Sequence, residues 1–158
     1  MQINFIALLA AGLVPIIVGF IYYHKKVVGN AWMNVTGMTE EKAREGNMAI
    51  IFSVSYILSI MLAFALNSLV IHQNGLFSLF GGDESNELYK QVFDLTKDNF
   101  RTFGHGALHG FITSVFVGLP ILGTNALFEQ KGWKYIWINV GYWAITITIM
   151  GGIICAWR

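Results

Sequence analysis

Two histidines, His105 and His109, stand four residues apart at the start of a long apolar run, and they have the most chemistry to offer. On an α-helix this spacing puts both imidazoles on one face. Such a pair can hold one metal ion between its rings, as the zinc-binding helix of a metalloprotease does. The sequence has no HExxH motif and only one cysteine, Cys155, so further ligands would have to come from elsewhere.

Additional ligands for a metal on this pair are not evident in the sequence. The other two histidines, His24 and His72, lie at the edges of predicted loops, and the nearest candidate carboxylates are Glu129 and the acids of the second loop. A single haem is excluded, because two rings on the same helix face cannot ligate its iron from both sides. We therefore expect no cofactor, and we keep a metal on His105 and His109 as an alternative.

Two other interpretations of the histidine pair stay open. Imidazole titrates near neutral pH, so two of them on one helix face could relay protons or sense pH. They could also be structural and hydrogen-bond to neighbouring helices or lipid headgroups. Ionisable residues within a membrane span are functional candidates by default, which keeps proton handling in consideration.

A polar track could continue from His105 and His109 along the same apolar run. Pro120 is predicted to break the helix and free carbonyl groups near mid-membrane. Asn125 and Glu129 follow four residues apart, and Glu129 would mark the far end of the track, unless it pairs with a nearby lysine. Other polar residues in the apolar runs are candidates for the same track: Tyr56, Ser59, Asn67 and Asn139.

The composition is that of a membrane protein. The chain of 158 residues is 55% hydrophobic and only 12% charged, whereas soluble domains average roughly 25% charged residues. The charges fall in short segments between four apolar runs. There is no cluster of Lys and Arg of the kind that nucleic acid requires, so we expect none as a partner.

Four apolar runs predict four transmembrane helices in a single domain, residues 1–158. The runs span residues 3–23, 48–71, 103–128 and 135–157, and each exceeds the roughly 20 residues that cross a bilayer. The first lacks the positively charged start of a secretory signal and is read as a retained span. The predicted fold is an all-α, integral membrane four-helix bundle in the lipid bilayer. Small residues suit close helix packing and association with copies of the chain or another membrane protein: Gly12, Gly19, Gly106 and Gly110.

The loops predict an interfacial helix and an orientation. Residues 84–100 read as an amphipathic helix, with Leu88, Val92 and Leu95 on its apolar side and a Lys90–Asp94 pair on the other. The positive-inside rule favours a cytoplasmic position for the first and third loops, with six basic residues against four on the opposite side. Both termini would then lie on the non-cytoplasmic side.

Several short motifs together resemble one family. They are Pro15-x-x-x-Gly19-x-x-Tyr22-Tyr23, Gly29-x-Ala31-Trp32-Met33, Gly37-x-Thr39-Glu40-Glu41, Phe103-Gly104-His105-Gly106-x-x-His109-Gly110, Pro120 with Asn125-Ala126-Leu127-Phe128-Glu129, and Ile138-Asn139-x-Gly141-Tyr142-Trp143. The chain is similar to a bacterial group of small four-pass membrane proteins catalogued as domain of unknown function 1761. The resemblance implies four helices in the bacterial cytoplasmic (inner) membrane and carries no established activity.

Three functions remain open at this point. The first is a non-catalytic membrane component that passes protons or a small solute, or serves as a subunit of an assembly, with the polar track from His105 and His109 to Glu129 as its path. The second is a metal-binding membrane enzyme that uses the two histidines. The third is a structural partner that docks through residues 84–100. We favour the first, and so expect no catalysis.

Overall fold

The computed structural model describes residues 3–158, and every regular element in that range is a helix. Four helices are long and apolar enough to cross a membrane: α1 (Phe5–Tyr22), α4 (Met48–Val70), the continuous span Phe103–Phe128, and α9 (Trp133–Ala156). Their ends lie within two residues of the predicted runs. The all-α bundle is therefore confirmed, with residues 1 and 2 of the predicted domain outside the described range.

Polar residues immediately before the helices fix where three of the spans begin. Asn4, Asn47 and Thr102 are in extended conformations before α1, α4 and the Phe103–Phe128 span. Each side chain accepts a hydrogen bond from the backbone N–H three residues later, at 3.0–3.2 Å. An N-terminal cap of this kind satisfies one of the helix's otherwise unpaired donors.

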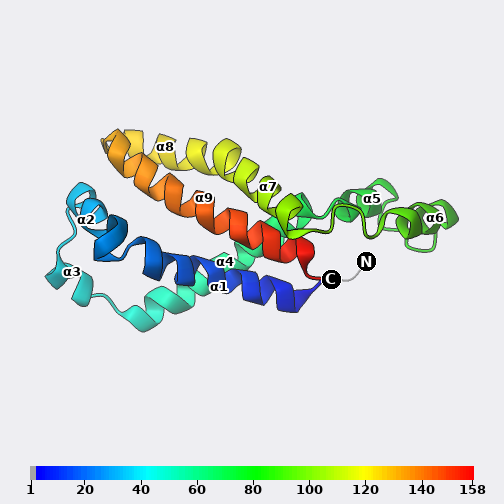
Figure 1. The fold of residues 1–158 in the computed structure, drawn as a ribbon, viewed down its shortest axis with the longest axis horizontal. Helices are drawn as coiled ribbons and strands as arrows, with labels where there is room; N and C mark the ends of the chain where they lie inside the picture. The colour runs from blue at the N-terminus through cyan, green and yellow to red at the C-terminus, as the bar shows by residue number, and fades with distance from the viewer. Residues whose placement is uncertain (1–2) are drawn as a thin grey trace.

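The helix α9 is the centre of the bundle and packs against the other three spans (Figure 1). The main core lies towards the end of the bundle that carries the termini, around Leu8, Leu66, Met150 and Ile154, each at most 1% exposed. The outward faces are also apolar; Phe116, for example, is 75% exposed. Soluble proteins rarely expose contiguous apolar surface of this extent, so these faces indicate contact with lipid.

The connecting segments gather at the two ends of the bundle (Figure 1). One end carries η1 (Lys25–Gly29), α2 (Asn30–Thr36), α3 (Glu40–Arg44) and the turn before α9. The opposite end carries the start of α1 and the end of α9 together with α5 (Gln73–Leu79) and α6 (Glu87–Thr96). The first span thus begins, and the fourth ends, at the same end of the bundle.

The second loop folds into two short helices that extend beyond the bundle (Figure 1). The amphipathic helix predicted over residues 84–100 is shorter, and Asn86 caps its start. Tyr89 is 4% exposed, and its ring contacts with Phe77 and Phe80 hold α5 and α6 together, while it stacks on Phe93 within α6. The predicted apolar side stays accessible, since Leu95 is 81% exposed.

The predicted pair between Lys90 and Asp94 was wrong. Lys90 instead binds Glu87, and Asp94 is bound by Lys97, each at 3.3 Å. In a helix the Cα–Cβ bonds tilt towards the N-terminus. Both lysines therefore reach back to an acid three residues earlier rather than forward.

The sequence predicts that Pro120 breaks the third span. This prediction is wrong, because the helical path continues through Pro120. The span runs through α7 (Phe103–Thr113), the π-helical turn η2 (Ser114–Gly118) and α8 (Leu119–Phe128). The N–H of Leu119 donates to the carbonyl of Ser114, five residues back. The wider turn directly precedes the proline, which has no N–H to donate, and so the helical path continues past it.

Candidate metal centre

The two predicted histidines lie on α7, on a face next to the one that packs against α9. Gly106 and Gly110 are buried in that packed face. A Cβ atom on Gly106 would overlap the carbonyl oxygen of Gly151, and one on Gly110 would overlap the carbonyl oxygen of Ile147. The close crossing fixes the rotation of α7 and so directs His105 and His109 away from α9.

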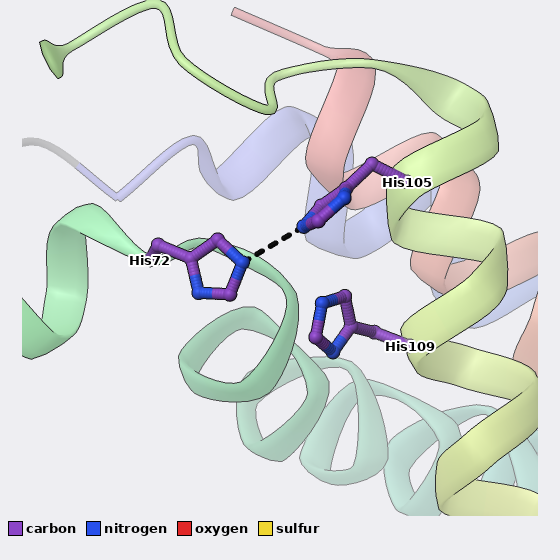
Figure 2. A group of neighbouring side chains, drawn as sticks. All are labelled: His72, His105 and His109. Atoms are coloured by element: carbon purple, nitrogen blue, oxygen red, sulfur yellow. Dashed lines mark hydrogen bonds between the residues drawn. The ribbon is translucent and has the colours of Figure 1, made fainter.

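A third histidine, His72, completes the cluster (Figure 2). The helix α4 ends at Val70, and His72 is the residue that precedes α5. Its Nε2 lies 2.8 Å from Nε2 of His105, and its ring centroid lies 5.0 Å from that of His109. The rings of His105 and His109 are 4.6 Å apart. Figure 2 shows all three rings turned towards one another.

One nitrogen from each of the three rings lies within 4.8 Å of the other two. A tetrahedral zinc ion with Zn–N bonds of 2.0–2.1 Å would hold its nitrogens about 3.3 Å apart. One pair, Nε2 of His72 and Nε2 of His105, is 2.8 Å apart, so the spacings within the cluster fall on both sides of that value. His72 is exposed and the other two are half-buried, so a fourth position can face solvent or a ligand. Three histidines with one open position is the ligand count of a catalytic rather than a structural zinc site.

Phe100 covers one side of the cluster. Its ring stacks on His105 with centroids 5.0 Å apart and meets His72 edge-on at 5.6 Å. Its backbone has φ of 63°, a left-handed conformation that is uncommon for a bulky residue. Such strain persists only where the surroundings enforce it. Here the carbonyl of Phe100 accepts from Sγ of the buried Cys155 at 3.2 Å, which ties the cover to α9.

The far part of the predicted polar track is not brought to this cluster. Asn125 lies 16 residues after His109, which is roughly 24 Å along a helix at 1.5 Å per residue. Asn125 and Glu129 are both exposed, and they lie towards the opposite end of the bundle.

The remaining polar candidates have separate partners rather than a shared site. Tyr56 donates to the carbonyl of Leu9, and Ser59 donates to the carbonyl of Ser55. Asn67 is buried, and its backbone carbonyl accepts from Asn74.

Asn139 lies in α9 and joins the polar groups near the other end of the bundle. Its Oδ1 accepts from the hydroxyl of Tyr23 at 3.3 Å, and its Nδ2 donates to the carbonyl of Tyr135 at 2.8 Å. The bond to Tyr23 links α9 to the end of α1, whereas the bond to Tyr135 lies within α9.

Two further glycines had been assigned to helix packing on α1. A Cβ on Gly12 would lie 3.0 Å from Ile60 on α4, so this position is tight. At Gly19 the nearest atoms belong to Tyr142 at 3.8 Å, an ordinary contact distance. Packing is therefore tight at Gly12, where a neighbouring side chain would have to shift to admit a Cβ, and ordinary at Gly19.

The sequence places His72 at the edge of a loop but does not predict that it lies next to His105 and His109. The available signal was topological: His72 follows the end of the second span, and the third span starts at the same end of the bundle with His105. Phe100 carried no such signal, because its role depends on a backbone conformation that the sequence does not reveal.

Comparison with known proteins identifies a family without an assigned activity. The profile described as "Protein of unknown function (DUF1761)" matches residues 6–155. The chain belongs to the DUF1761 family. The match covers all four spans and the three histidines, so the suspected family is confirmed. No curated protein and no solved structure matches this DUF1761 chain.

Proposed function

We propose that this protein is a membrane metal-binding protein that holds one divalent transition-metal ion with His72, His105 and His109. The single observation that carries the proposal is the convergence of three imidazoles from two segments of the chain within 4.8 Å. Imidazole suits Zn²⁺, Cu²⁺, Ni²⁺ and iron. Because His72 adds a third candidate ligand, the cluster favours the metal-binding alternative over a polar track.

Three neutral imidazoles would leave the full charge of a divalent ion uncompensated. A zinc ion held by three such ligands would lower the pKa of a water molecule in its fourth position to about 7 and would attract anions. The site is thus suited to bind a hydroxide or an anionic ligand. We propose no reaction beyond this.

We place the site at the non-cytoplasmic face of the bacterial cytoplasmic membrane. The support is the basic first and third loops, which lie at the opposite end from His72. By the positive-inside rule those loops face the cytoplasm. A reporter that is active only outside the cytoplasm, fused after Arg158, reads this orientation directly.

Metal loading of the purified full-length protein tests the proposal. We expect chelator-treated protein in a neutral detergent at pH 7.5 to take up one Zn²⁺ per chain on dialysis. Co²⁺ in its place should give the intense visible absorption of a four-coordinate site. Absence of saturable binding of Zn²⁺, Co²⁺, Ni²⁺ and Cu²⁺ would overturn the proposal.

The affinity for metal should fall as pH falls. An imidazolium ion has no free lone pair, and the ordinary pKa of histidine is about 6.5. Between pH 7.5 and 5.5 the apparent affinity for Co²⁺ should drop between about tenfold, for one protonated ligand, and a thousandfold, for three. A pH-independent affinity in spectroscopic titrations would mean that other groups bind the ion.

Proton handling is the second candidate, because His72 and His105 share a hydrogen bond of 2.8 Å. One ring donates and the other accepts, so a proton lies between the two imidazoles. The same preparation decides between the candidates. If His72 and His105 share a proton and bind no metal, added Co²⁺ will not give the intense visible absorption of a four-coordinate site.

A further inference from the structure

A second polar site lies at the same end of the bundle, separate from the three histidines. It is a pocket of about 250 Å³ between the ends of α1, α4 and α9 and the segment that follows α6. Sites that enclose a drug-sized ligand measure about 300–1,000 Å³. This pocket therefore suits a small polar group. Phe93 and Trp157 contribute to its wall, as expected for the membrane–water interface, where aromatic residues gather.

The charged side chains of the pocket are mostly basic. Lys97, Arg101 and Arg158 line it together with a single acid, Asp98. Arg158 binds Asp98 at 2.8 Å, and these two charges offset each other. Within residues 3–158, Lys97 forms its ion pair with Asp94, an exposed acid outside the pocket, and such exposed pairs contribute little to stability.

Arg101 supplies the positive charge that most needs a counter-charge. Its guanidinium donates to the carbonyls of Cys155 at 2.8 Å and Trp157 at 3.0 Å, which are neutral acceptors. None of the ion pairs within residues 3–158 includes Arg101, although it is half-buried. A planar guanidinium in this position is well suited to a phosphate oxygen.

Two buried amide side chains in the pocket could form hydrogen bonds with a ligand. Asn67 and Gln73 line the pocket and are 7% and 6% exposed. Nε2 of Gln73 donates to the carbonyls of Thr96 and Asn99, whereas its Oε1 has no partner among the described residues. A buried acceptor without a hydrogen bond is destabilising. A ligand that brings a hydroxyl donor would recover part of this.

We propose that this pocket binds an anionic phosphate ester that carries a hydroxyl group, with Arg101 and Lys97 on the phosphate and the Asn67–Gln73 amides on the hydroxyl. A phosphoglycerol lipid headgroup has this chemistry, and so does a free phosphate in part. An ammonium-bearing headgroup is disfavoured by the same basic side chains. The proposal does not depend on metal at the histidines.

Titration calorimetry on the full-length protein in a neutral detergent tests this site. The probes are dihexanoyl phosphatidylglycerol, dihexanoyl phosphatidylcholine and inorganic phosphate. We expect saturable binding of one phosphatidylglycerol per chain, at least about tenfold tighter than phosphatidylcholine. Inorganic phosphate that competes with the lipid would show that the phosphate group suffices, and phosphate that fails to compete would show that the lipid headgroup is required. Equal affinity for the two lipids, or no saturable binding, overturns the proposal.

Variants of exposed lysines locate the binding without disturbing the fold. Lys97→Ala should weaken phosphatidylglycerol binding at least about fivefold, and Lys97→Glu should weaken it further, because the charge is reversed. Lys134→Ala is the matched control, since this exposed lysine lies at the opposite end of the bundle. If Lys134→Ala weakens phosphatidylglycerol binding as much as Lys97→Ala does, the attraction is nonspecific and the proposed site is wrong.

Discussion

Replacing His72 by alanine should lower the affinity of the protein for Zn²⁺ or Co²⁺ at least about 100-fold, which corresponds to about 2.8 kcal/mol. Even residues that only support a metal ligand typically contribute 10- to 100-fold to affinity. His72 would be a direct ligand, and its loss leaves only His105 and His109. Competition with a coloured chelator measures the change.

The fold should tolerate this substitution, so the effect can be read as a loss of ligation. His72 is exposed, and its side chain makes no capping bond to α5. His24→Ala is the control: His24 is also exposed and lies at the opposite end of the bundle, although its Nδ1 accepts a hydrogen bond from the N–H of Lys26 at the start of η1. His72→Asp should restore part of the affinity, since a carboxylate also binds zinc. Unchanged metal affinity in His72→Ala would contradict a three-histidine site.

The four spans could be predicted because length and hydrophobicity alone decide whether a segment crosses a bilayer. The runs at 48–71 and 103–128 match the helices α4 and α7–η2–α8 almost residue for residue. Pro120 was misjudged because its effect depends on hydrogen bonds one turn earlier, in η2, and a π turn has no clear sequence signature. The apolar pattern was thus sufficient for the spans and insufficient for their local geometry.

The candidate site could be predicted only in part, and the missing part is tertiary. His105 and His109 are neighbours through helical periodicity, which a sequence reveals directly. His72 is 33 residues before His105, and the loop between them contains α5 and α6. Its approach depends on how α4 ends and how that loop returns to α7. Asn125 and Glu129, by contrast, share the helix with the pair and are still too far along it to meet the imidazoles.

Replacing Gly106 by alanine should destabilise the protein by about 3 kcal/mol or more. Overpacking a core typically costs 1–3 kcal/mol, and here the added methyl group would meet the backbone of Gly151 and Cβ of Cys155 rather than a flexible side-chain tip. The α7 and α9 helices would have to separate, because close approach of membrane helices relies on small residues at the crossing. Thermal unfolding in detergent, followed by circular dichroism, measures the loss.

Gly104→Ala is the control for this prediction, since it lies on the same helix with no atom within 4 Å of its added Cβ. It should be neutral or stabilising by up to about 1 kcal/mol, from helix propensity alone. The two variants should also differ in metal binding. Separation of α7 from α9 would move His105 and His109 relative to His72, so Gly106→Ala should weaken Co²⁺ binding while Gly104→Ala should not. Equal stability of the two variants would mean that the α7–α9 crossing is looser than described, and the rotation that directs the two histidines towards His72 would then need another cause.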